Sequence, residues 1–123
     1  MAKKKQGGDK GRKQVIVSYC RLKGYPIPIP EHKFHIPGII FDKQRLWRLD
    51  LFWESAKLGL EIHGGVFVKG RHVRGVGMTK DCEKFSVLAI QGCRLLQVTT
   101  GQVDSGFVFK LLDEEFKNGG MAE

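Results

Sequence analysis

The stretch LWRLDLFWESAKLGLEIH, residues 46–63, decides the fold because it reads as two strands joined by a short turn. Apolar and polar side chains alternate on both sides of the turn, with a period of two that is typical of half-buried strands. The four residues from Glu54 form a plausible connection between them. If Trp53 lies opposite Leu58, the hairpin places Asp50 opposite Glu61 with their Cβ atoms about 5 Å apart.

Two carboxylates at that distance repel each other unless a proton or a cation compensates them. A divalent metal is the simplest compensation. Hard oxygen ligands suit Mg²⁺, with Mn²⁺ as a softer alternative, and the carbonyl of Ile62 together with waters can complete the coordination. The same alternation puts Trp47 and Trp53 on the face opposite Asp50, where we expect core packing rather than base stacking.

Composition indicates one soluble globular domain. The chain has 123 residues, of which 41% are hydrophobic and 28% charged, and it lacks an apolar run near the roughly 20 residues that a membrane helix requires. Residues 1–10 are rich in lysine and glycine, so we predict a disordered basic tail followed by a single domain over residues 11–123. The three cysteines are widely spaced and form no CxxC motif, which favours a reducing cytoplasm over a disulfide framework or zinc site.

A formal net charge of +8 and a pI near 9.6 favour a polyanionic partner, with nucleic acid ahead of an anionic membrane. Six lysines and arginines lie within the first 13 residues, where they either contact DNA or merely keep a disordered tail soluble. A second cluster lies in the glycine-rich stretch 64–78 and just after it. Glycines permit close backbone approach to phosphates, so we predict DNA contacts there from Lys69, Arg71, His72, Arg74 and Lys80.

The remaining elements complete an α/β fold. Hydrophobic spacing and capping residues predict helices over about 12–23, 79–91 and 104–117 and strands over 31–36 and 94–99. The crossover from residue 58 to residue 99 through a helix makes its two strands parallel, so the sheet is mixed and flanked by helices. In the helix over 79–91 we expect a buried stripe formed by Cys82, Phe85, Leu88 and Ala89.

Asp50 is followed after ten intervening residues by Glu61, and after one more residue by His63. This spacing resembles the core motif of the PD-(D/E)XK nuclease superfamily. The wider sequence is similar to small phage and prophage members of that superfamily, which are akin to very-short-patch repair endonucleases and Holliday-junction resolvases. The stretches that carry the resemblance are Phe34-His35, residues 47–53, residues 60–65, residues 70–72 and residues 80–84. They span roughly residues 31–100.

The resemblance implies a three-layer, restriction-endonuclease-like core and a metal-dependent endodeoxyribonuclease. It also implies DNA products with a 3′-hydroxyl and a 5′-phosphate, and a phage or prophage protein acting in the cytoplasm of a bacterial host. Asp50 and Glu61 match the metal-binding acids of the motif. His63 departs from it, because it stands where the family has a catalytic lysine.

An imidazole at position 63 has several interpretations. It serves as general base, stabilises the phosphorane as a cation, or ligates Mn²⁺; alternatively, it marks a nuclease that has lost its lysine and only binds DNA. His72 is a second catalytic candidate or a phosphate contact. Glu31 is a candidate third carboxylate if its strand neighbours the hairpin, and otherwise a solvated residue at a strand end. We expect Lys84 to lie on the solvated face of its helix; the alternative is that its ammonium is directed toward the site.

The sequence therefore predicts a Mg²⁺-dependent DNA endonuclease that prefers branched or structured DNA. A resolvase makes two symmetric cuts and so requires a homodimer, whereas a mismatch-type nicking enzyme can be a monomer. A non-catalytic DNA-binding module is the competing class, and a basic RNA-binding or ribosome-associated protein ranks last because it gives the opposed carboxylates no purpose.

Overall fold

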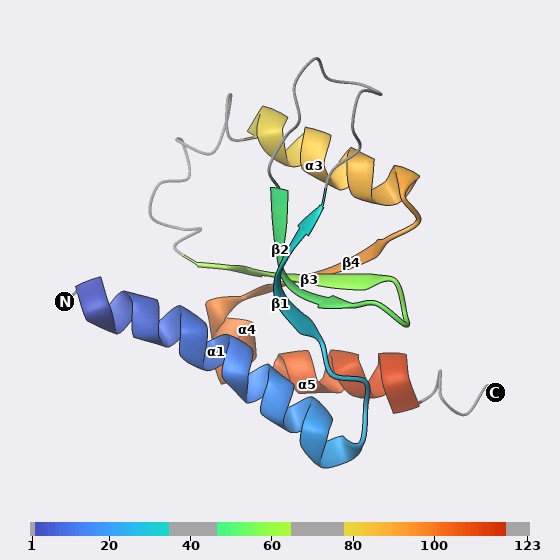
Figure 1. The fold of residues 1–123 in the computed structure, drawn as a ribbon. Helices are drawn as coiled ribbons and strands as arrows, with labels where there is room; N and C mark the ends of the chain where they lie inside the picture. Colours follow the sequence, from blue (N-terminus) through green and yellow to red (C-terminus); the bar gives the residue numbers. More distant parts are fainter. Residues whose placement is uncertain (1, 35–46, 65–77, 118–123) are drawn as a thin grey trace.

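The computed structural model describes residues 2–34, 47–64 and 78–117, which form four strands and several helices (Figure 1). None of the described helices is long and apolar enough to cross a membrane. The elements in chain order are α1 (Ala2–Lys23), β1 (Ile29–Phe34), β2 (Trp47–Trp53), β3 (Leu58–His63), α3 (Met78–Ile90), β4 (Arg94–Thr99), α4 (Thr100–Asp104), α5 (Phe107–Leu112) and the π-helical turn η2 (Asp113–Lys117).

The predicted hairpin is confirmed in its register. β2 pairs antiparallel with β3 so that Trp53 faces Leu58 and Leu51 faces Leu60. The connection is a four-residue turn in which Lys57 adopts a left-handed conformation with φ of 52°. The next step along this register brings Asp50 to the level of Glu61.

The sheet has the order β1-β2-β3-β4 and is mixed, as the sequence predicts. β1 pairs antiparallel with β2, and β4 pairs parallel with β3 over its whole length. The parallel pair follows from the crossover through α3, because a helical connection returns the chain to the same end of the sheet. β1 is an edge strand, which is where Pro30 is tolerated because one side of that strand needs no ladder donor.

Helices cover both faces of the sheet, giving an α/β architecture in three layers (Figure 1). On one face α1, α4 and α5 pack on a core that includes Trp53 and Leu60. On the other face α3 packs on a smaller core that includes Leu49 and Phe52. Both faces of β2 are therefore covered by helices. This explains why the strand has more apolar residues than a strict apolar–polar alternation would give.

The prediction that Trp47 and Trp53 share one face is wrong. Trp53 is fully buried on the α1 side, whereas Trp47 packs with Phe34 on the α3 side. The alternation is interrupted between these two residues, because Leu49 packs on the same side as Phe52. The interruption lies at Asp50, whose side chain takes part in the hydrogen bonding between β2 and β3.

Three helices differ from prediction in their limits or orientation. α1 begins at Ala2, so it continues through the segment for which we predicted a disordered tail; lysine and glutamine there are good helix formers. In α3 the buried residues are Val87 and Leu88, and the predicted stripe is wrong at Cys82 and Ala89, which are exposed. The C-terminal helical segment begins after Thr99, which caps α4 through a capping box with Gln102, rather than at Asp104 or Ser105.

Candidate functional site

Asp50 bridges the two strands of the hairpin through its side chain. Its Oδ2 accepts a hydrogen bond of 2.7 Å from the backbone N–H of Ile62. A carboxylate thus takes the place of a ladder carbonyl at the point where the regular pairing of β2 and β3 stops at Leu51 and Leu60. This bond fixes the orientation of the Asp50 carboxylate beside Glu61.

Glu61 is the most strongly perturbed acid of the site. Its side chain is only 13% exposed, and its Oε2 is buried and faces the ammonium of Lys84. Burial raises the pKa of Glu61, the charge of Lys84 opposes that shift, and the charge of Asp50 adds to it. The two hairpin carboxylates are therefore close enough to interact electrostatically, as the sequence predicts.

Lys84 reaches this pair from α3. Its Nζ lies 3.1 Å from Glu61 Oε2, close enough for an ion pair, and its side chain is only 16% exposed. The expectation of a solvated face is wrong for this residue, and the alternative of a charge directed to the site is confirmed. Because α3 turns Val87 and Leu88 to the sheet, Lys84 lies one turn earlier on the same inward side.

His63 lies on the same face of β3 as Glu61, two residues further along the strand. Its Nε2 is 3.0 Å from Oε1 of Gln97 on β4, and β4 places Gln97 directly beside Glu61 in the parallel register. An amide oxygen only accepts, so this contact uses an N–H on Nε2; in the neutral tautomer that has this N–H, Nδ1 keeps its lone pair. A basic nitrogen is thus available two positions from the acid.

Glu31 is not brought to the hairpin carboxylates. Its strand does neighbour the hairpin, because β1 pairs with β2. Its carboxylate instead forms ion pairs with Lys13 of α1 and, at 3.3 Å, with Arg48 of β2. Two cations thus hold that side chain, and its part as a third acid ligand stays a prediction.

The cations predicted to contact DNA are only partly placed. Lys80 is exposed near the start of α3, one turn before Lys84. Lys69, Arg71, His72 and Arg74 lie outside the described residues, so their roles stay predictions. The role of the Ile62 carbonyl as a metal ligand likewise stays a prediction. The site contact observed for Ile62 is made by its N–H, which donates to Asp50.

The side chains present fit a divalent metal in one respect and fall short in another. Among residues 10–34, 47–64 and 79–117, no group of three or more His, Cys, Asp or Glu side chains is arranged to hold a metal ion. A Mg²⁺ site, however, is commonly built on one or two carboxylates with waters and substrate phosphate oxygens. The buried carboxylate of Glu61, beside that of Asp50, supplies oxygens of the kind such an ion requires.

Comparisons of the chain with protein-family models, with curated proteins and with solved structures gave no match.

Sequence analysis missed one residue of the site and gave another too little weight. Gln97 escaped notice because the strand over 94–99 reads as a buried apolar run, yet its alternation places residue 97 on the face of Glu61 once the strands pair in parallel. Lys84 carried a usable signal in its spacing, since it precedes the apolar pair Val87 and Leu88 by three and four residues.

Proposed function

We propose that this protein is a metal-dependent DNA endonuclease with a restriction-endonuclease-like core. The observation that carries the proposal is the buried carboxylate of Glu61, whose Oε2 lies 3.1 Å from the Lys84 ammonium and whose pKa is raised further by the charge of Asp50. Keeping an acid partly desolvated beside a second acid costs stability, so such an arrangement points to a role in chemistry rather than in folding. The mixed sheet and the hairpin register support the same proposal.

Asp50 and Glu61 would hold the metal. A Mg²⁺ ion at these oxygens would supply a water of lowered pKa and would neutralise the charge that develops on the scissile phosphate. Asp50 is held for this task by the amide of Ile62, so its carboxylate needs little reorganisation when the ion binds. Lys84 would then be released from Glu61, because the cation replaces its charge at Oε2.

Lys84 would take the part of the lysine that is absent at position 63. From its position beside Glu61, its ammonium would stabilise negative charge that develops on the scissile phosphate. His63 has a different part in this account. Its Nδ1 lone pair would accept a proton, while Gln97 holds the ring through Nε2.

DNA is the proposed substrate because of the charge of the chain. The excess of +8 suits a polyanion, and Lys80 presents an exposed cation one turn from the site. Branched DNA is the preferred form in this proposal, acted on by a homodimer that makes two symmetric cuts. A very-short-patch type of nicking enzyme would act on mismatched duplex and requires no second subunit.

A non-catalytic DNA-binding module is the second candidate, and one observation favours it. Lys84 already neutralises Glu61 in the absence of any metal, so the pair is compatible with a purely structural ion pair. That module would bind DNA in a salt-dependent way and would cut nothing.

Cleavage of labelled DNA distinguishes these candidates. Four-way junction, mismatched duplex and linear duplex are each incubated with the protein in Mg²⁺, Mn²⁺ or EDTA, and Asp50→Asn serves as the control because asparagine keeps an oxygen that can accept from the amide of Ile62. Metal-dependent cutting that disappears in Asp50→Asn supports the proposal. Binding of DNA without cutting in either metal overturns it in favour of the module.

The part assigned to Lys84 has a matched control on the same helix. Lys84→Met and Lys80→Met remove one charge each, one turn apart, but only the first removes the charge beside Glu61. We expect Lys84→Met to lower the single-turnover cutting rate by about 10²-fold or more, as removal of one preorganised electrostatic group does. An equal loss in both variants would show that only the overall charge of α3 matters.

A further inference from the structure

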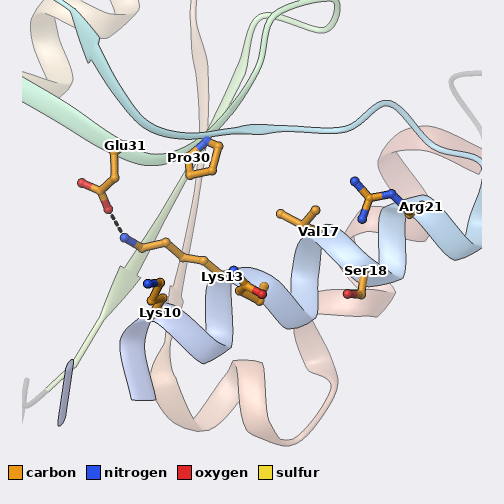
Figure 2. Close-up of a pocket in the computed structure, with 8 residues that line it drawn as sticks. Lys10, Lys13, Val17, Ser18, Arg21, Pro30 and Glu31 are labelled. Atoms are coloured by element: carbon orange, nitrogen blue, oxygen red, sulfur yellow. Dashed lines mark hydrogen bonds and ion pairs between the residues drawn. The ribbon is translucent and has the colours of Figure 1, made fainter. Parts of the chain in front are cut away.

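A groove of about 670 Å³ lies between α1 and the edge strand β1, apart from the Asp50–Glu61 site (Figure 2). The helix contributes basic and polar side chains, and Pro30 and Glu31 of β1 form the opposite wall. Val17 gives the groove an apolar surface between the charged residues. The cations in its lining are Lys10, Lys13 and Arg21.

Positive charge in this groove exceeds negative charge. The only acid in its lining is Glu31, which pairs with Lys13 and also with Arg48. Lys10 and Arg21 are exposed and have no carboxylate partner among the described residues. Cations without a paired acid, held along one wall, attract an extended anion.

The length of the cationic row matches a DNA strand. Lys10 and Arg21 are eleven residues apart on one helix, a span of about 16 Å at 1.5 Å per residue. A duplex carries one phosphate per strand for about every 3.4 Å of its axis, so the row spans about four or five phosphates. Gln14 and Ser18 lie between the cations and supply neutral donors of the kind that contact phosphate oxygens.

Glu31 occupies the place of an anion at one end of this groove. Its carboxylate bridges Lys13 and Arg48, and its backbone adopts a φ of 53°, a conformation that residues other than glycine rarely take. A carboxylate held by two cations resembles the way in which they would hold a phosphate. The pairs on either side of it, Pro30 with Leu51 and His32 with Leu49, also place Glu31 at the level of Asp50.

We propose that the groove between α1 and β1 binds the phosphodiester backbone of DNA and that Glu31 is an internal anion that the DNA displaces. The inference rests on the proposed function in that DNA is the partner. It adds a second contact surface on the α1 side of the sheet, beyond the cations predicted from the sequence stretch 64–78.

Binding of a fluorescein-labelled four-way junction, measured by anisotropy in EDTA over a range of salt concentrations, tests the inference. Lys10→Gln with Arg21→Gln is compared with Lys110→Gln with Lys117→Gln, a pair of exposed lysines on α5 and η2 that carries the same change in charge. Each phosphate contact contributes about 0.9 to the slope of log affinity against log salt. We therefore expect the groove pair to lower that slope by about 1.8 and the control pair to leave it unchanged.

Glu31→Gln gives a prediction of the opposite sign. Removal of the internal anion leaves Lys13 and Arg48 free to bind phosphate, so the affinity for DNA rises and the salt slope steepens. The single variants Lys10→Gln and Arg21→Gln, each expected to lower the slope by about 0.9, replace the double variant if thermal unfolding shows that it does not fold.

Equal salt slopes in the groove and control pairs, with no gain in Glu31→Gln, would overturn the inference. Groove-dependent binding of a double-stranded RNA of equal length that is tighter than binding of the DNA would overturn the assignment to DNA. Cutting with Mg²⁺ by wild-type protein is measured in parallel. If the wild-type protein does not cut, the proposed function is overturned, and the salt slopes still test whether the groove binds DNA. If it cuts but the groove variants leave the salt slope unchanged, only the groove proposal is overturned.

Discussion

The two faces of the sheet differ in size and in the charge they bury. The face covered by α1, α4 and α5 has a core of ten buried residues, against five on the face covered by α3. Among the described residues, the α3 face alone places an acid and a base, Glu61 and Lys84, between its helix and the sheet with little exposure of either side chain. Stability is thus concentrated on one face, and the other tolerates desolvated charge.

Hydrogen bonds reinforce the larger core. Tyr19 and Tyr25 both donate to Oδ1 of Asp113, at 2.8 and 2.7 Å, and so join α1 and the connector after it to η2. These bonds lower the pKa of Asp113 and help to raise that of Tyr25 to about 12. A substitution on this face should therefore change folding, and one beside Asp50 or Glu61 should change function first.

The largest loss of stability is expected from Trp53→Ala. Trp53 is fully buried in the larger core, and its Nε1 donates to the carbonyl of Pro26 at 2.9 Å. Removing a buried indole costs about 3–5 kcal/mol in the free energy of unfolding. Urea denaturation measures it, and Trp53→Phe, which keeps most of the volume, should lose less. A cost below about 1 kcal/mol for the alanine variant would contradict the contrast between the faces.

Gly59→Ala tests the packing of the α3 face. A Cβ at residue 59 would lie 2.8 Å from Cδ1 of Leu49, so the added methyl group displaces a buried side chain. Such overpacking costs about 1–3 kcal/mol. In the Leu49→Ala background the collision is absent, so a double-mutant cycle should give a coupling of about 0.5–3 kcal/mol. Additive effects of the two changes would mean that these residues are not in contact.

The structural part of Asp50 is separated from its proposed metal-binding part by two substitutions. Asp50→Ala leaves the N–H of Ile62 without its acceptor, whereas Asp50→Asn retains one. An unsatisfied, partly buried donor costs about 1–3 kcal/mol, so the alanine variant should be less stable than the asparagine variant by up to that amount. Equal stability of the two, measured by thermal unfolding, would show that this hydrogen bond contributes nothing.

Glu61→Gln should produce the smallest change in stability, with a characteristic dependence on pH. Burial raises the pKa of Glu61 in the folded protein, so folding favours its protonated form. The contribution of this group is therefore greatest below its ordinary pKa and is lost as the pH rises through the raised value. Without metal, the variant should match the wild-type protein in acid and exceed it at neutral pH.

A divalent ion should remove that difference. Ions that bind the folded state stabilise it by mass action, so Mg²⁺ should raise the melting temperature of the wild-type protein and leave that of Glu61→Gln unchanged. Thermal unfolding from pH 4 to pH 8, with and without Mg²⁺, checks both expectations. A variant that is less stable than wild type at neutral pH would reverse the sign and reject the pKa argument.

The sequence predicted the sheet better than it predicted the helices. The turn after Trp53 determines the register of the hairpin, and the crossover through α3 makes β4 parallel to β3, so local patterns and chain handedness were sufficient. The exception is Asp50, where a side-chain oxygen enters the ladder and ends the regular alternation. Periodicity alone contains no information about such a substitution of side chain for backbone.

The orientation of α3 illustrates what periodicity leaves open. The predicted stripe through Cys82, Phe85, Leu88 and Ala89 is buried at Leu88, but the sheet buries Val87 beside it and leaves Cys82 and Ala89 exposed. This orientation turns Lys84 toward Glu61. The ion pairs of Glu31 were not foreseen for a related reason, since its partners, Lys13 and Arg48, come from elements far apart in the chain.

Binding of a metal ion to the hairpin acids is the most direct test of the proposed function. Calorimetric titration of Mn²⁺ into the wild-type protein, Asp50→Asn and Glu61→Gln requires neither DNA nor turnover, and both variants keep the shape of the residue they replace. We predict one site in the wild-type protein and its loss in both variants. No binding to wild-type protein, or equal binding to all three, would contradict a metal centre at Asp50 and Glu61.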